Sequence, residues 1–139
     1  MSQPDDYAGE VTLEEAWALL RDDPGAVLID VRTAAEWSFV GVPDLGAIGK
    51  EARFVEWISF PSGAPNPNFV EQASDGLEPG QPVVLLCRSG ARSLGAARAM
   101  TAIGLGPAYN VTAGFEGPLD EAGHRAGGWK HAGLDWRQS

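Results

Sequence analysis

The sequence contains a single cysteine, Cys87, and only two histidines among its 139 residues. One cysteine excludes an intramolecular disulfide framework and a zinc site built from several cysteines. It also excludes a resolving cysteine within the chain, so a covalent intermediate on Cys87 must be discharged by another molecule. His124 and His131 have no further ligands nearby at a recognised metal-binding spacing. We therefore expect no metal and no cofactor.

Basic residues and long apolar runs are scarce as well. The formal net charge of −9 argues against nucleic-acid binding, which requires a basic surface. No apolar run approaches membrane-spanning length, and the polar, acidic residues 1–6 do not resemble a signal peptide. We therefore expect a cytoplasmic protein with no nucleic-acid or membrane partner. The sequence does not indicate an oligomeric state.

The length and the hydrophobic content of 44% fit one globular domain with its own core. We expect a flexible leader over residues 1–10 and a single domain over residues 11–139. Short apolar runs alternate with helical segments in this domain. That alternation favours an α/β fold with a mainly parallel sheet.

Capping patterns and apolar runs predict the individual elements. Capping boxes that begin at Thr12 and Thr33 predict helices to about Arg21 and Val40. A third helix is expected from about Ala91 to Ile103, before Gly104. Strands are expected at 26–31, 57–60, 83–86 and 108–111, and short helices at 68–74 and 119–123.

The segment after the apolar run 83–86 carries the clearest chemistry; it reads Cys87-Arg88-Ser89-Gly90-Ala91-Arg92-Ser93. The order of strand, tight loop and helix makes the thiol face loop N–H groups and the positive end of a helix. Together with the two arginines, these groups favour a thiolate, and Gly90 permits the positive φ that such a loop requires. We interpret Cys87 as a nucleophile and residues 88–93 as its anion-binding loop. The alternative is a small buried residue that ends a core strand.

A second polar group follows the strand expected at 26–31. Ligands of parallel sheets bind beyond the carboxyl ends of the strands, so Asp30 and Arg32 are expected to face the same crevice as Cys87. Asp30 can steady the site by bonding loop amides or an arginine, or it can be an ordinary polar residue at a strand end. Arg32 and Glu36 are spaced i,i+4, which on its own indicates a surface ion pair.

The motifs resemble those of the rhodanese-like family. Residues 87–92 match its catalytic loop, often written C-x-x-G-x-R, and Asp30-Val31-Arg32 with Glu36 is similar to its D-V-R-x-x-x-E element. Gly114-Phe115, followed by Trp129 and residues 130–134, is similar to its closing pattern. The resemblance implies a small parallel sheet with helices on both faces. It also implies that Asp30, Arg32 and Glu36 are structural supports of the site.

The resemblance further implies a sulfurtransferase. Cys87 would take sulfane sulfur from a small donor such as thiosulfate, hold it as a persulfide, and pass it to cyanide, a thiol or a protein acceptor. Arg92, together with Arg88, would bind the sulfonate of the donor.

The sequence departs from the family over residues 41–67, where Gly41-Val42-Pro43-Asp44-Leu45-Gly46-Ala47 replaces the common G-H-I-P-G-A stretch. This long, aromatic segment is expected to shape access to the site, either as a gate or as a partner-binding surface, and Trp37 and Trp57 are candidates to line an acceptor groove. Two other functions stay open. One is a non-catalytic rhodanese-type module that binds a partner or senses oxidants. The other is a small cysteine phosphatase or arsenate reductase, although only four residues separate Cys87 from Arg92, one fewer than in the phosphatase loop C-x-x-x-x-x-R.

Overall fold

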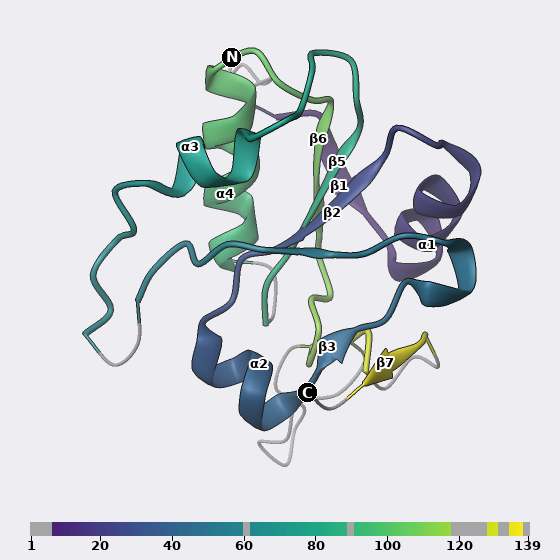
Figure 1. Cartoon of the computed structure of the whole chain (residues 1–139), viewed down its shortest axis with the longest axis horizontal. Coiled ribbons are helices and arrows are strands. Elements are labelled where there is room, and N and C mark those ends of the chain that lie inside the picture. The colour runs from purple at the N-terminus through teal and green to yellow at the C-terminus, as the bar shows by residue number, and fades with distance from the viewer. Residues whose placement is uncertain (1–6, 60–61, 89–90, 118–127, 131–133, 138–139) are drawn as a thin grey trace.

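A five-stranded sheet forms the centre of the computed structural model, which describes residues 7–59, 62–88, 91–117, 128–130 and 134–137 (Figure 1). The strands follow the order β1-β6-β5-β2-β4, and every neighbouring pair is parallel. Their bounds are Gly9–Val11 for β1, Val27–Asp30 for β2, Arg53–Phe54 for β4, Val83–Leu86 for β5 and Ala108–Val111 for β6. Two further short strands, β3 (Val42–Pro43) and β7 (Trp136–Arg137), pair antiparallel outside this sheet. The predicted α/β class with a mainly parallel sheet is confirmed.

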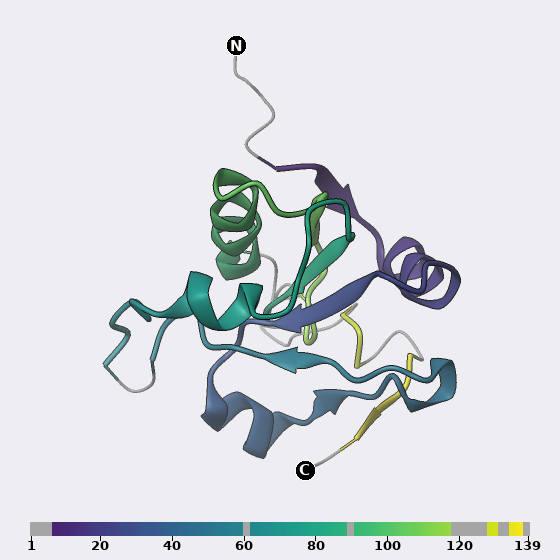
Figure 2. The same ribbon diagram turned by 45° about the horizontal axis from the view of Figure 1, so that its top comes forward.

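Helices cover both faces of the sheet, as expected (Figures 1 and 2). The helices α3 (Phe69–Ser74) and α4 (Ala91–Ala102) lie on one face, and α1 (Leu13–Asp22) lies on the other. The helix α2 (Ala34–Val40) follows β2 and leads through Gly41 into β3, and a 3₁₀ turn, η1, spans Gly46–Ile48. Within the described residues no helix combines the length and the apolar character needed to cross a membrane.

Both predicted capping boxes are present. The Thr12 hydroxyl accepts the Glu15 N–H at 3.0 Å, while the Glu15 carboxylate accepts the Thr12 N–H at 2.8 Å. The same reciprocal pair joins Thr33 and Glu36 at 3.3 and 3.1 Å. Each box satisfies N–H groups that have no partner within the first turn of a helix, which is why these two starts were readable from the sequence.

The elements differ from the sequence-based expectations at the edge of the sheet and near the N-terminus. The strand predicted over residues 57–60 is wrong at its described positions, 57–59. The edge strand is β4 instead, and after it only single hydrogen bonds from the N–H groups of Val55 and Trp57 reach the chain at the end of β2. The Trp57 ring turns instead against Phe69, with the ring centroids 4.9 Å apart. The leader expected over residues 1–10 overlaps the start of β1, and the short helix expected at 119–123 lies outside the described residues.

Alternation along the strands decides which face each side chain meets. Ile29 and Leu85 pack toward α3 and α4, whereas Leu28 and Val84 pack toward α1. Cys87, one residue beyond β5, continues the first set and belongs to the cluster under α4. The thiol therefore lies on the α4 side of the sheet, where the chain turns from β5 into that helix.

Gly128 allows a close backbone approach near the site. A Cβ atom at this position would lie 2.4 Å from the Gly117 nitrogen and 2.6 Å from the Glu116 carbonyl carbon. Both atoms belong to backbone that bonds the carbonyl of Arg88, so neither side can yield without moving the segment after Cys87.

We expect Gly128→Ala to lower the free energy of unfolding by about 1–3 kcal/mol, as overpacking of a close contact does. Urea unfolding measures it. Gly25→Ala is the control, because its added Cβ meets its nearest neighbour at an ordinary 3.5 Å. Equal stabilities for the two variants would contradict the close approach.

Candidate functional site

Backbone contacts from two directions fix the position of Cys87. The residue follows β5 directly and is 1% exposed. Its carbonyl accepts the Phe115 N–H at 2.8 Å, and the carbonyl of Arg88 accepts the N–H groups of Glu116 and Gly117 at 3.0 and 3.1 Å. The α4 helix starts at Ala91, so the thiol lies close to its positive end. Because Ser89 and Gly90 lie outside the described residues, the convergence of loop N–H groups on the sulfur stays a prediction.

A buried polar chain runs from the sulfur to the edge of the sheet. The Ser93 hydroxyl oxygen lies 3.3 Å from the Cys87 sulfur and also bonds the side-chain carbonyl of Asn110. The amide nitrogen of Asn110 donates to the Glu10 carboxylate at 2.9 Å, and the Thr112 hydroxyl donates to the same oxygen at 2.7 Å. Ser93 is fully buried and Asn110 is 3% exposed, so this chain orients polar groups directly behind the thiol.

Sequence reasoning included Ser93 in the site but missed Asn110 and Glu10. The available indication was a polar residue, Asn110, inside the otherwise apolar strand segment 108–111. A buried amide needs partners, and its partners come from β1 and α4, which are distant in the sequence.

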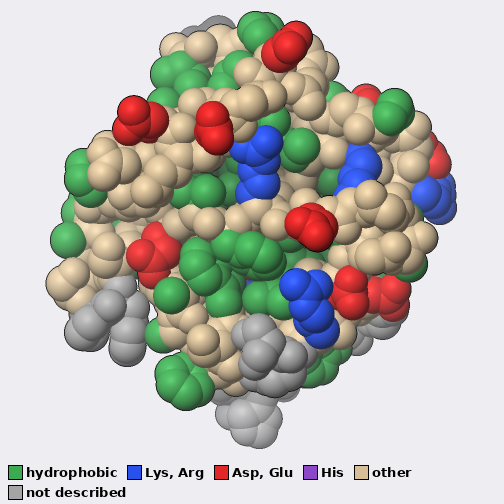
Figure 3. Space-filling view, viewed as in Figure 1, with side chains coloured by type: hydrophobic (Ala, Val, Ile, Leu, Met, Phe, Trp, Pro, Cys, Tyr) green, Lys and Arg blue, Asp and Glu red, His purple; other side chains and the backbone are tan. Residues whose placement is uncertain are grey.

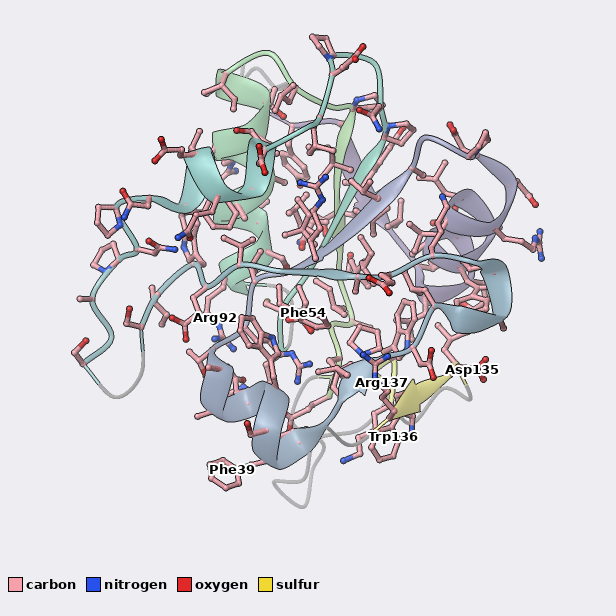
Figure 4. All side chains as sticks on the ribbon, in the orientation of Figure 1. Phe39, Phe54, Arg92, Asp135, Trp136 and Arg137 are labelled. Atoms are coloured by element: carbon pink, nitrogen blue, oxygen red, sulfur yellow. The ribbon has the colours of Figure 1, made fainter. Side chains whose placement is uncertain are left out.

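Arg92 forms a bidentate ion pair with Glu36. The two nitrogen–oxygen distances are 2.8 and 3.0 Å, and each side chain is about one-fifth exposed. The pair joins the first turn of α4 to the first turn of α2. Arg92 is labelled in Figure 4. Fork-to-carboxylate pairing of this kind fixes orientation as well as position.

The pKa values of the pair reflect this contact. Burial raises the pKa of Glu36, but hydrogen bonds from Arg92 and Thr33 and the charge of Arg92 outweigh it and lower that pKa from 4.5 to about 2. Burial lowers the pKa of Arg92, but the bonds and charge of Glu36, followed by the negative charges of Cys87 and Asp30, raise it above its ordinary value. Arg92 is thus coupled electrostatically to the thiolate form of Cys87.

Asp30 and Arg32 form a second ion pair, with both side chains fully buried at a nitrogen–oxygen distance of 2.7 Å. The i,i+4 spacing of Arg32 and Glu36 left a surface ion pair open as an alternative to structural support, and the two side chains do not form that pair. Arg32 precedes Thr33, the N-cap of α2, so the i,i+4 spacing does not place it on the helix with Glu36. Asp30 is aligned with Leu86 across β2 and β5, which turns its side chain toward the face opposite Cys87.

Arg32 connects this pair to the rest of the site. One guanidinium nitrogen donates both to Asp30 and, at 2.8 Å, to the carbonyl of Gly41 at the end of α2. The guanidinium carbon lies 4.1 Å from the centroid of the Phe115 ring. The backbone N–H of Phe115 donates to the carbonyl of Cys87. Asp30 and Arg32 therefore support the loop from behind, through Phe115.

A groove of about 500 Å³ lies beside the cysteine loop. Its described lining comes from α2, the segment 58–63 and the residues that flank Cys87, and consists of Thr33, Ala35, Glu36, Phe39, Val40, Ile58, Ser59, Gly63, Arg88, Arg92 and Glu116. We call it the loop groove. Arg88 is exposed and forms no side-chain hydrogen bond or ion pair with another described residue.

The atypical segment 41–67 contributes to this groove through residues 58, 59 and 63. Trp37 and Trp57, which were candidates to line an acceptor groove, are not among the residues that line the loop groove. Trp37 packs against Phe54 with the ring centroids 5.3 Å apart, and Trp57 packs against Phe69 and lies beside Gly95. Aromatic composition alone therefore did not identify the groove walls.

The described residues contain no group of three His, Cys, Asp or Glu side chains able to hold a metal ion. His124 and His131 lie outside the described residues.

Comparison with known proteins agrees with this architecture. A family model for the Rhodanese-like domain matches residues 12–120. The chain belongs to the rhodanese-like family. The crystal structure of Rv0390 from M. tuberculosis is similar over 96% of this chain and 99% of its own, with 53% sequence identity and a TM-score of 0.89.

Of two other relatives of this rhodanese-like chain, one is described as uncharacterized and one as a sulfur transferase. An uncharacterized protein of Rickettsia conorii is 35% identical over 123 residues, which cover 88% of this chain and 92% of the relative. A solution structure described as a polysulfide-sulfur transferase homodimer from Wolinella succinogenes is 27% identical. It covers 78% of this chain and 70% of its own, with a TM-score of 0.57. These likenesses support a sulfurtransferase-type fold.

Breaking the buried pair between Asp30 and Arg32 is expected to be costly. Asp30→Ala leaves the guanidinium charge buried without its carboxylate, so we expect the free energy of unfolding to fall by about 3–5 kcal/mol. The double variant Asp30→Ala/Arg32→Met removes both charges and should recover part of that loss. Chemical denaturation measures both, and a double variant less stable than Asp30→Ala would contradict the explanation.

The ion pair of Glu36 predicts an acid-sensitive contribution to stability. Because folding lowers the pKa of Glu36, its contribution is full above about pH 4.5 and is lost as the pH falls toward 2. Wild type should therefore lose up to about 3 kcal/mol more than Glu36→Gln over this range. Glu14→Gln, at an exposed position of α1, is the control and should follow the wild-type profile. Identical profiles for wild type and Glu36→Gln would exclude the ion pair as the cause.

Proposed function

We propose that the chain is a sulfurtransferase that carries sulfane sulfur on Cys87 as a persulfide. The observation that carries the proposal is the placement of the single cysteine. It is buried at the strand-to-helix turn, with Ser93 beside its sulfur and Arg92 coupled to its charge. A helix N-terminus and a nearby guanidinium stabilise a thiolate and, equally, the anion of a persulfide.

The chemical step requires only a nucleophile and a leaving group. The Cys87 thiolate attacks the outer sulfur of the donor, and a new sulfur–sulfur bond forms. The bond from that sulfur to the rest of the donor breaks, and its electron pair leaves with the departing group, which is sulfite when the donor is thiosulfate. An external nucleophile, a thiolate or cyanide, then attacks the outer sulfur of the persulfide and regenerates the Cys87 thiolate.

The two arginines have different tasks in this proposal. Glu36 occupies both terminal nitrogens of Arg92, so Arg92 serves the sulfur chiefly through its charge and by fixing the start of α4. Arg88 lines the loop groove without a side-chain partner among the described residues, so it is the cation that contacts an anionic donor.

Two comparisons support the assignment. The chain belongs to the rhodanese-like family over residues 12–120, and one similar structure is described as a polysulfide-sulfur transferase. The short interval between Cys87 and Arg92 also favours a sulfur-sized cradle over a phosphate-sized one.

Exposure to sulfane-sulfur donors tests the proposal. Incubation with thiosulfate or polysulfide should add one sulfur, about 32 Da, to the intact protein at Cys87, and cyanide should remove it. Intact-protein and peptide mass spectrometry follow both steps, with Cys87→Ser as the variant that stays unmodified. If no donor leaves sulfur on Cys87, the proposal fails; oxidation of Cys87 by peroxide without sulfur uptake would then favour the redox-sensing alternative.

A further inference from the structure

The loop groove has a nearly balanced set of charges. Its described lining supplies two arginines, Arg88 and Arg92, and two glutamates, Glu36 and Glu116. Arg92 and Glu36 neutralise one another through their two hydrogen bonds, which leaves Arg88 and Glu116 as the other charged residues of the described lining. These two are neighbours, because the Glu116 N–H donates to the carbonyl of Arg88 at 3.0 Å. A doubly charged anion gains one unpaired cation there but also meets a carboxylate.

The surroundings do not add a positive field. The whole chain carries a net charge of −9, and Asp and Glu side chains are interspersed with Lys and Arg on the face seen in Figure 3. A field of this sign repels dianions at long range, so their attraction would have to come from the groove itself.

Apolar side chains also line the groove. Phe39, Val40 and Ile58 line it, and Phe39 is 84% exposed. Figure 4 shows Phe39 projecting outward from α2, the helix whose first turn holds Glu36 against Arg92. An exposed phenyl ring on the wall of a groove, next to two further apolar side chains, provides a surface that a ligand can cover.

The size of the groove also fits an organic ligand. About 500 Å³ lies within the range of roughly 300–1,000 Å³ that pockets for organic ligands occupy. Thiosulfate, with its few atoms, would fill only the end beside Arg88.

We infer that the sulfur donor is an organic sulfane-sulfur compound with one negative charge and an apolar group, rather than thiosulfate. This inference rests on the proposed function of Cys87. The reactive sulfur lies toward Cys87 and Arg88, and the apolar group lies against Phe39, Val40 and Ile58. The thiolate takes the outer sulfur, and the carrier leaves with the bonding electron pair as a thiolate or a sulfinate.

Three donors separate the effects of charge and of apolar contact. Thiosulfate carries two charges, methanethiosulfonate carries one charge and a small group, and benzenethiosulfonate carries one charge and a phenyl group. The rate of Cys87 persulfide formation is measured for each donor in single turnover. It is then divided by that donor's rate with free N-acetylcysteine, which removes differences in intrinsic reactivity. We expect the corrected rate for benzenethiosulfonate to exceed those of the other two donors by at least about tenfold, as expected when the phenyl group is buried against three apolar side chains.

Variants then locate the apolar contact. Phe39→Ser should remove most of the advantage of benzenethiosulfonate over methanethiosulfonate. The matched control is Ile103→Ser, which also removes an exposed apolar side chain, 47% exposed, and does not line the groove. Ile103→Ser should leave the ratio of the corrected rates for benzenethiosulfonate and methanethiosulfonate unchanged. Glu116→Gln should raise the corrected rate of thiosulfate more than that of methanethiosulfonate, because it removes the carboxylate that a dianion meets.

The outcomes distinguish this inference from the function on which it rests. If all three donors load Cys87 and thiosulfate is as good as benzenethiosulfonate, the donor class is wrong and the sulfurtransferase stands. A phenyl advantage that survives Phe39→Ser unchanged also overturns the inference, because the apolar group then binds elsewhere. If no donor loads Cys87, the proposed function itself fails and the inference fails with it.

Discussion

The buried ion pair between Asp30 and Arg32 is the constraint on which the rest of the site depends. Taking both charges out of water costs several kcal/mol for each ion, which the contact between the two charges and the hydrogen bonds of Arg32 Nε and Nη2 offset. The third nitrogen, Nη1, is buried without a hydrogen-bond partner among the described residues. Arg32 extends those bonds to the carbonyl of Gly41 and stacks on Phe115. The Phe115 N–H in turn holds the carbonyl of Cys87. A contact on one face of the sheet thereby fixes a thiol that belongs to the other face.

The ion pair between Arg92 and Glu36 gives Arg92 a structural role that Arg88 does not have. Glu36 is fixed twice, by the capping box with Thr33 and by the fork of Arg92. The cap lies within α2, whereas the fork crosses from α2 to α4, so movement of either helix relative to the other would break the fork. The first turns of α2 and α4 are therefore linked, and Cys87 lies just before the start of α4. Arg88 forms no comparable ion pair with a described residue, and it lines the loop groove.

The sequence predicted best those features that are determined by contacts between residues close together in the chain. The helix starts at Thr12 and Thr33 follow from reciprocal bonds within four residues, and the cysteine turn follows from a strand, a glycine and a helix in direct succession. The edge strand β4 was missed because an edge is defined by its partner, β2, and not by the apolar content of residues 57–60. The partners of Asn110 and Arg92 were missed for a related reason: these contacts span 17 to 100 positions of sequence and become visible only when β1, α2 and α4 are placed.

The charge of Arg92 has different effects at the sulfur and in the groove. At the sulfur, the negative charge of Cys87 is one of the interactions that raise the pKa of Arg92. In the groove, the same guanidinium is presented together with the Glu36 carboxylate, and a charge pair attracts an approaching anion far less than a lone cation does. In the proposed function, this arrangement would place a positive charge near the sulfur without making the groove a general binding site for anions. On the donor class that we propose, selectivity would depend on Arg88 for the single charge of the donor and on the exposed apolar end of α2 for the group that carries the sulfur.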